Sequence, residues 1–162
     1  MHLPGMLPLH VLLFLGQPGH PLCEAANRFL TSDRQLSTQV EADTLDDWRT
    51  RKVLHGCRIT AAGGTTRGLQ REAEFFYERI RAIGGWVRTP DPRDAPNEGS
   101  LRFRTGVGSQ AADCLFNVFG DAMLMTDAEL RVDEQRPLQA GETRYHVYAM
   151  CTPALPAAPR DG

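Results

Sequence analysis

The stretch TRGLQREAEFFYERIRAI, residues 66–83, decides the fold of this 162-residue chain. Its apolar side chains recur at intervals of three and four, on one stripe of an α-helix: Leu69, Ala73, Phe76, Ile80 and Ile83. The opposite side carries charged residues, so the pattern predicts a helix with one buried and one solvated face. Thr65 or Thr66 is the predicted N-cap, and Gly84-Gly85 is a stop signal.

Alternating apolar and polar residues on both sides of this helix predict β-strands. The first covers 52–61, with His55 and Cys57 on its more apolar face, and is predicted to end at Gly63-Gly64. The other four strand patterns lie at 101–105, 112–119, 130–133 and 143–152, and a weaker, shorter pattern at 86–89 is not counted among them. This β-α-β-β-β-β order predicts an α+β fold, in which a single long helix packs on one face of a four- to five-stranded, mainly antiparallel sheet.

The N-terminal residues have the pattern of a cleavable signal peptide. The apolar run at 6–15 is too short to span a bilayer, and cleavage after Ala25 would follow small residues. A buried N-terminal strand or helix is the alternative, as is a lipoprotein modified at Cys23, for which the bulky Leu22 is unsuitable. The predicted organisation is a signal peptide over 1–25, a polar linker over 26–44, a domain over 45–152 and a disordered tail over 153–162, which places the mature protein in the periplasm or outside the cell.

The cysteines follow from this organisation. Cleavage after Ala25 removes Cys23 and leaves Cys57, Cys114 and Cys151, each on the apolar face of its strand. An oxidising compartment would pair two of the three. We predict a Cys57–Cys151 disulfide, with Cys57–Cys114 as the alternative, and a buried thiol at the remaining position.

The charge distribution argues against two classes of partner. The formal net charge is −2, and the arginines are scattered along the chain instead of forming one basic run. No general attraction to nucleic acid or to an anionic membrane follows from such a composition. We therefore expect no nucleic-acid partner. The shortness of the apolar run at 6–15 separately predicts that there is no transmembrane helix.

Several local patterns resemble reactive sites without completing them. The Gly63–Gly68 turn before the helix lacks the Gly-Lys-Ser/Thr of a phosphate-binding loop. His55 and Cys57 point the same way on a strand, but such side chains are about 6.5–7 Å apart, beyond hydrogen-bond reach. The acidic residues of the proline-rich 89–98 loop lack calcium-binding spacing, and His55 and His146 are predicted on opposite sheet faces. We expect no metal and no cofactor.

By elimination, the sequence predicts a secreted, non-enzymatic binding or interaction domain of the cell envelope, whose partner is an unknown protein or envelope component. The candidate binding residues are Asp91, Arg93, Asp94, Arg102, Arg104, His146 and Tyr148. One alternative is a small hydrolase or transferase with a site near His55, Cys57 and the 89–98 loop. The other is a structural subunit of an envelope complex.

Overall fold

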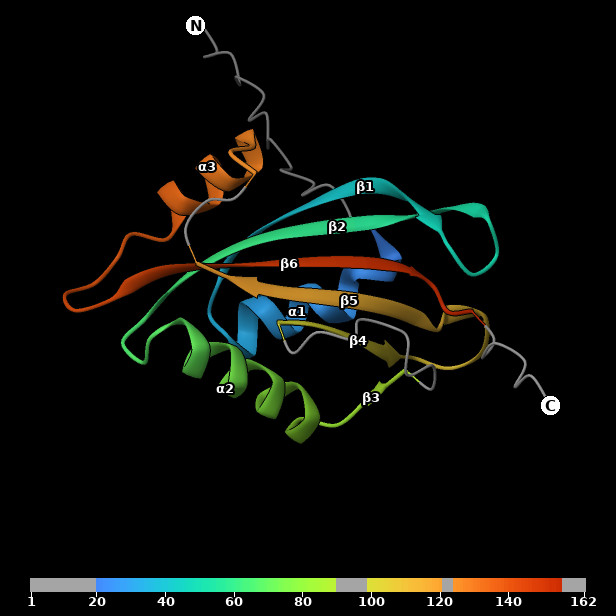
Figure 1. Ribbon diagram of the computed structural model, residues 1–162, viewed down its shortest axis with the longest axis horizontal. Coiled ribbons are helices and arrows are strands. Elements are labelled where there is room, and N and C mark those ends of the chain that lie inside the picture. The colour runs from blue at the N-terminus through green and yellow to red at the C-terminus, as the bar shows by residue number, and fades with distance from the viewer. Residues whose placement is uncertain (1–19, 90–98, 121–123, 156–162) are drawn as a thin grey trace, which may run out of the picture.

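A computed structural model describes residues 20–89, 99–120 and 124–155 of the chain (Figure 1). Within these residues one antiparallel sheet has the order β1-β2-β6-β5-β4-β3. Its strands are β1 (Ser37–Asp47), β2 (Lys52–Thr65), β3 (Trp86–Arg88), β4 (Ser100–Thr105), β5 (Ala112–Phe119) and β6 (Thr143–Pro153). The helices are α1 (Glu24–Arg28), α2 (Leu69–Ala82) and α3 (Asp127–Gln135), with short turns η1 (Pro21–Cys23), η2 (Phe29–Asp33) and η3 (Gly108–Gln110).

The helices lie on both faces of the sheet (Figure 1). On one face, α1, η2 and α2 pack together, and three rings from three elements meet there. Phe29 lies 5.2 Å from Phe76 between ring centroids, and Phe116 of β5 lies 6.4 and 5.7 Å from these two rings. α3 lies on the other face. The predicted α+β class and antiparallel sheet are confirmed, whereas the single helix and the four or five strands are corrected to three helices and six strands.

The N-terminal segment is part of the folded domain. Cys23, Ala26 and Leu30 have no exposed surface, because they recur at helical spacing and face the sheet. The predicted polar linker over 26–44 is therefore wrong, since it covers most of α1, all of η2 and much of β1. The apolar run at 6–15 and most of the predicted tail lie outside the described residues, and cleavage after Ala25 stays a prediction.

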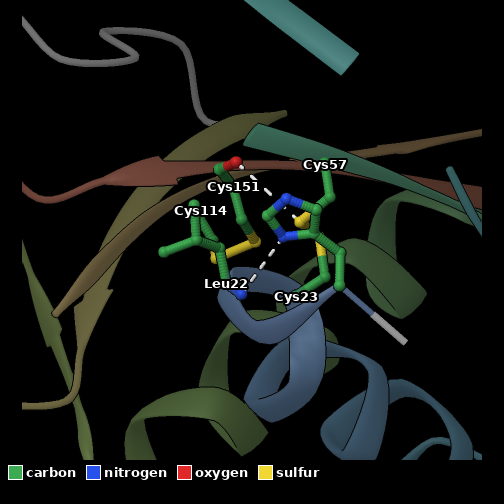
Figure 2. The surroundings of a disulfide bond; sticks show 6 residues. Leu22, Cys23, Cys57, Cys114 and Cys151 are labelled. Atoms are coloured by element: carbon green, nitrogen blue, oxygen red, sulfur yellow. Dashed lines mark hydrogen bonds between the residues drawn. A yellow bond between two sulfur atoms is a disulfide. The ribbon is translucent and has the colours of Figure 1, made fainter. Parts of the chain in front are cut away.

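The disulfides differ from the predicted pairing. Cys23 is bonded to Cys57, and Cys114 is bonded to Cys151, so none of the four is a free thiol. The predicted Cys57–Cys151 bridge was based on β2 and β6 being neighbours, which they are. It is wrong because β5 presents Cys114 to the other side of Cys151, while η1 brings Cys23 to Cys57 (Figure 2).

The predicted strand at 130–133 is instead part of α3. Thr126 caps this helix: its side chain accepts from the Glu129 N–H, and the Glu129 side chain accepts from the Thr126 N–H. This reciprocal arrangement is a capping box. Ala128, Glu129 and Val132 form the buried face, so the alternation of Leu130 and Val132 with polar residues was a misleading signal.

β2 does not end at the glycine pair as predicted. It continues to Thr65 through Gly63, where a Cβ atom would lie 2.4 Å from Leu36 and 2.8 Å from the Tyr145 ring. Glycine therefore permits both side chains to pack against the strand. The start of α2 moves accordingly to Leu69, with Gly68 at the N-cap instead of Thr65 or Thr66.

We expect Phe76→Ala to destabilise the domain by about 3–5 kcal/mol, because it empties the centre of the aromatic cluster. Val87→Ala, at a side chain that is 64% exposed, is the control and should change stability by less than about 0.5 kcal/mol. Urea unfolding of both variants measures the difference. Equal midpoints would contradict the packing of α2 on the sheet.

Candidate functional site

A groove of about 670 Å³ lies between α2 and the β4–β5 part of the sheet. Its apolar lining is contributed by Leu69, Ala73 and Tyr77 from the helix and by Leu101 and Val118 from the strands. Leu69 is 43% exposed, so apolar surface of the helix remains in contact with water. A concave surface that is mainly apolar, with a few polar groups at its edge, is the usual form of a binding site.

The polar edge of the groove follows the solvent side of α2. Gln70, Glu74 and Glu78 are one helical turn apart, and Arg81 follows at the end of the row. Gln70 donates to Glu74 at 3.3 Å. Both carboxylates are exposed, and neither forms an ion pair with another residue in the described ranges. The edge therefore presents two negative charges that are not neutralised within this part of the chain.

Tyr77 fixes the inner wall of the groove. Its hydroxyl lies 3.1 Å from the carbonyl oxygen of Gly99 and 3.0 Å from that of Phe116. The proton is donated towards these acceptors and is directed away from a ligand. Burial raises the pKa of Tyr77 to about 12, so the phenol stays protonated at physiological pH. Tyr77 is thus a positioning residue that ties α2 to the ends of β4 and β5.

Two of the sequence-predicted candidates, His146 and Tyr148, lie on the opposite face, against α3. The ring nitrogens of His146 lie 2.8 Å from the Gly120 carbonyl oxygen and 2.6 Å from an Asp133 carboxylate oxygen. Both nitrogens thus face acceptors, and the side chain is only 1% exposed. His146 therefore joins α3 to the sheet and leaves neither nitrogen to exchange a proton with a substrate.

Tyr148 makes a similar contact two residues along β6, on the same face, where its hydroxyl donates to Glu129. Burial opposes ionisation of Glu129, but hydrogen bonds from Tyr148 and from backbone N–H groups at the start of α3 lower its pKa overall. Burial and this carboxylate raise the pKa of Tyr148. Tyr148 also borders a hollow of about 250 Å³ with Phe119 and Leu124, so part of the ring remains accessible.

The other candidates are either consumed by structural contacts or not described. Arg104 binds both oxygens of Asp113, at 2.7 and 3.0 Å, and Arg102 is only 7% exposed, so the structure does not present these two candidate binding residues as an open cationic surface. Asp91, Arg93, Asp94 and the loop at 89–98 lie almost wholly outside the described residues.

The predicted alternative nucleophile is also corrected. Cys57 is bonded to Cys23, so it has no thiolate to offer. His55 is exposed instead of facing the core, because the β1–β2 hairpin extends beyond the helices that cover the sheet (Figure 1). The hydrolase or transferase site predicted near His55 and Cys57 therefore lacks its nucleophile.

A buried charge cluster joins the start of α2 to the N-terminal segment. Glu72 is 1% exposed, accepts from Thr65 and Arg67 at 2.8 and 3.0 Å, and is paired with Arg34. Burial favours the protonated acid, but these hydrogen bonds and the charges of Arg34 and Arg67 lower the pKa of Glu72 overall. The Gly63–Gly68 turn, which resembles a phosphate-binding loop in sequence, thus binds the carboxylate of Glu72 from the same chain.

In the ranges that the structure describes, no group of three His, Cys, Asp or Glu side chains is placed to hold a metal ion. No helix there is long and apolar enough to cross a membrane. Comparisons with protein-family models, curated proteins and solved structures give no match.

Sequence reasoning missed both the groove and the residues that hold α3. The groove depends on how far α2 stands from β4, which no local pattern encodes. The acidic partners of His146 and Tyr148 were detectable, because Thr126-Asp127-Ala128-Glu129 has the spacing of a capping box. A helix beginning there places Glu129 and Asp133 on one face, matching His146 and Tyr148 on one face of a strand.

Glu72→Gln should lower the free energy of unfolding at pH 7 by about 3 kcal/mol, because it leaves Arg34 buried without its counter-charge. The pKa of Glu72 is lowered on folding, so its contribution is present above the ordinary value of 4.5 and is lost as the pH falls through the folded value. The variant should therefore lose less stability than the wild type between pH 5 and about pH 3.

Glu74→Gln is the matched control, since Glu74 is exposed on the same helix. It should change stability by less than about 0.5 kcal/mol and keep the wild-type dependence on pH. Thermal unfolding followed by circular dichroism at several pH values makes the comparison. An unchanged acid dependence in Glu72→Gln would show that the buried cluster does not contribute as described.

Proposed function

We propose that this chain is a binding domain that acts outside the cytoplasm and holds an extended segment of a partner protein in the groove between α2 and the β4–β5 part of the sheet. The observation that carries the proposal is the groove itself, with its apolar lining and the two exposed carboxylates, Glu74 and Glu78, at its edge. Other titratable groups, including Glu72, Glu129 and His146, are already committed to contacts that hold the fold together.

The length of the groove favours an extended peptide. Its lining runs from Leu69 to Arg81, which is about 18 Å along a helix at about 1.5 Å per residue. An extended chain rises by about 3.3 Å per residue, so about five residues would fill this length. Alternate side chains of such a segment point the same way and would enter the apolar lining at Ala73 and Leu101.

The charge at the edge favours a cationic segment. Glu74 and Glu78 face solvent on the side of α2 that borders the groove, and Arg81 lies beyond them at one end. Lys or Arg side chains that flank an apolar side chain of the partner would neutralise these two carboxylates. Each exposed pair contributes little, about 0.2–1 kcal/mol, so the charges select among partners while apolar burial provides most of the affinity.

The test uses two acetylated, amidated peptides, Lys-Leu-Val-Leu-Lys and Glu-Leu-Val-Leu-Glu, titrated into the isotope-labelled protein by NMR. The cationic peptide should shift resonances of α2, β4 and β5 and bind about tenfold more tightly than the acidic one. Ala73→Arg should weaken this binding by about tenfold or more, because it fills the lining.

Ala82→Arg is the control for that substitution, because Ala82 is exposed on the same helix and does not line the groove. Glu74→Lys should weaken binding of the cationic peptide by about fivefold, whereas Glu134→Lys on α3 makes the same charge change at a distance. Shifts centred on another surface, or equal binding by Ala73→Arg and Ala82→Arg, would rule out the groove. Equal affinity for both peptides would leave the groove but rule out the cationic partner.

We further propose that the chain is exported, and that the cut which releases it lies before Cys23. Two disulfides and the apolar run at 6–15 support export, because disulfides persist in oxidising compartments. A cut before Cys23 is supported by the burial of Leu30 and Ala26 and by the bond from Cys23 to Cys57. The cleavage position after Ala25 would remove that bond.

Intact-mass measurement of the secreted protein tests the position of the cut. We expect a mature chain that contains Cys23, with a mass four hydrogens lower than that of the fully reduced form. Non-reducing peptide mapping should yield the Cys23–Cys57 and Cys114–Cys151 pairs. A chain starting at Ala26 would contradict this proposal and support the signal peptide over 1–25, and a chain retaining Met1 would contradict export by cleavage.

A further inference from the structure

Three of the four cysteines form a row across the centre of the sheet. Cys57 of β2 is the register partner of Cys151 on β6, and Cys114 of β5 is the partner of Cys151 on the other side. Adjacent strands are about 4.8 Å apart, so all three side chains lie on one face at neighbouring positions. Figure 2 shows the two disulfides in the same layer, with Cys23 reaching Cys57 from the N-terminal helical turn.

This placement gives Cys151 two possible partners. The Cα atoms of Cys114 and Cys151 are 4.1 Å apart, and Cys57 is the register partner of Cys151 across the opposite edge of β6. While Cys57 is bonded to Cys23, it has no thiolate with which to attack Cys151. Because β2, β6 and β5 are consecutive in the sheet, a sulfur atom of Cys57 would approach Cys151 from the side opposite Cys114, the direction that displacement at a disulfide sulfur requires.

We propose that the cysteines of this row undergo thiol–disulfide exchange, and that the bond between Cys23 and Cys57 prevents the exchange while it is intact. A dithiol reductant that opens this bond is itself oxidised to a disulfide and leaves thiols at Cys23 and Cys57. The Cys57 thiolate then attacks the sulfur of Cys151. A Cys57–Cys151 bond forms, the Cys114–Cys151 bond breaks, and Cys114 leaves as a thiolate that takes up a proton.

The exchange makes the disulfide pairing within the sheet depend on the position of the N-terminal segment. All four cysteines have no exposed surface, and η1, α1 and η2 supply the cover. A reductant therefore acts only when this segment lifts from the sheet. After exchange, Cys23 has no disulfide partner at Cys57, so the segment is held by non-covalent packing alone.

The test uses full-length Cys23→Ser, secreted under oxidising conditions, acid-quenched, alkylated and mapped without reduction. Both Cys57–Cys151 and Cys114–Cys151 peptides should be found in measurable amounts, because Cys57 and Cys114 are both register partners of Cys151. Interconversion should speed up as the pH rises towards the thiol pKa, since the thiolate is the attacking species. Cys23→Ser with Cys57→Ser is the control and should contain Cys114–Cys151 alone.

A second arm does not require the variant to fold. The wild-type protein is treated with a limiting amount of dithiothreitol, quenched at timed intervals and mapped in the same way. Appearance of the Cys57–Cys151 peptide together with an alkylated Cys114 supports the proposal. Recovery of alkylated Cys57 with intact Cys114–Cys151 at every time and pH, in this arm or in the folded variant, would overturn it.

Discussion

The contact among Phe29, Phe76 and Phe116 is the interaction on which the rest of the structure depends. It joins the N-terminal helical segment, α2 and the sheet at one point, with ring separations between 5.2 and 6.4 Å. Because α1 and η2 occupy part of the sheet face, α2 covers only the remainder, and the groove lies on its β4–β5 side. The N-terminal segment thus belongs to the core and also determines where the groove lies.

The second face of the sheet is covered by a different kind of contact. α3 is joined to β6 by two acid-containing pairs, Asp133 with His146 and Glu129 with Tyr148, in addition to the apolar Val132. On the first face, Glu72 connects α2 to Arg34 of the N-terminal segment. Such pairs contribute strongly only while both members are present and charged or hydrogen-bonded. Because these pairs contain carboxylates, protonation at low pH would weaken contacts on both faces of the sheet. The carboxylates on the solvent side of α2 take no part in these pairs and remain available to a ligand.

Local periodicity predicted α2, β4, β5 and β6, although not all of them have one buried and one exposed face. α2 has this form, whereas no residue of β4 or β5 is exposed and β6 is exposed only at its two ends. The positions of all four elements were predicted to within a few residues. β1 was missed because an edge strand that is half-exposed on both faces has no strong apolar alternation. α3 was taken for a strand because four alternating residues outweighed the capping box at Thr126. A short alternating pattern is therefore assigned to a strand or a helix reliably only when helix-capping and turn residues beside it are considered as well.

The candidate site was harder to predict for a physical reason. Charged residues such as Arg104 and His146 are visible in the sequence, but whether they are free depends on partners that are distant in the chain, here Asp113 and Asp133. The groove arises from the spacing of whole elements. The cysteine pairing was predicted without Cys23, because the predicted cleavage after Ala25 would remove it. Once Cys23 is retained, the register of β2, β6 and β5 allows both observed bridges.

The central claim is that the segment from Cys23 to Leu30 is an integral, buried part of the domain. Native-state hydrogen exchange of the oxidised protein measures this directly. Amides of Phe29 and Leu30 should be protected to a degree comparable with those of the central strand β6, because they open only when the shared aromatic core opens. Exchange of these amides at the rate of an unfolded chain, with β6 still protected, would show that the segment is an appendage and would contradict the account.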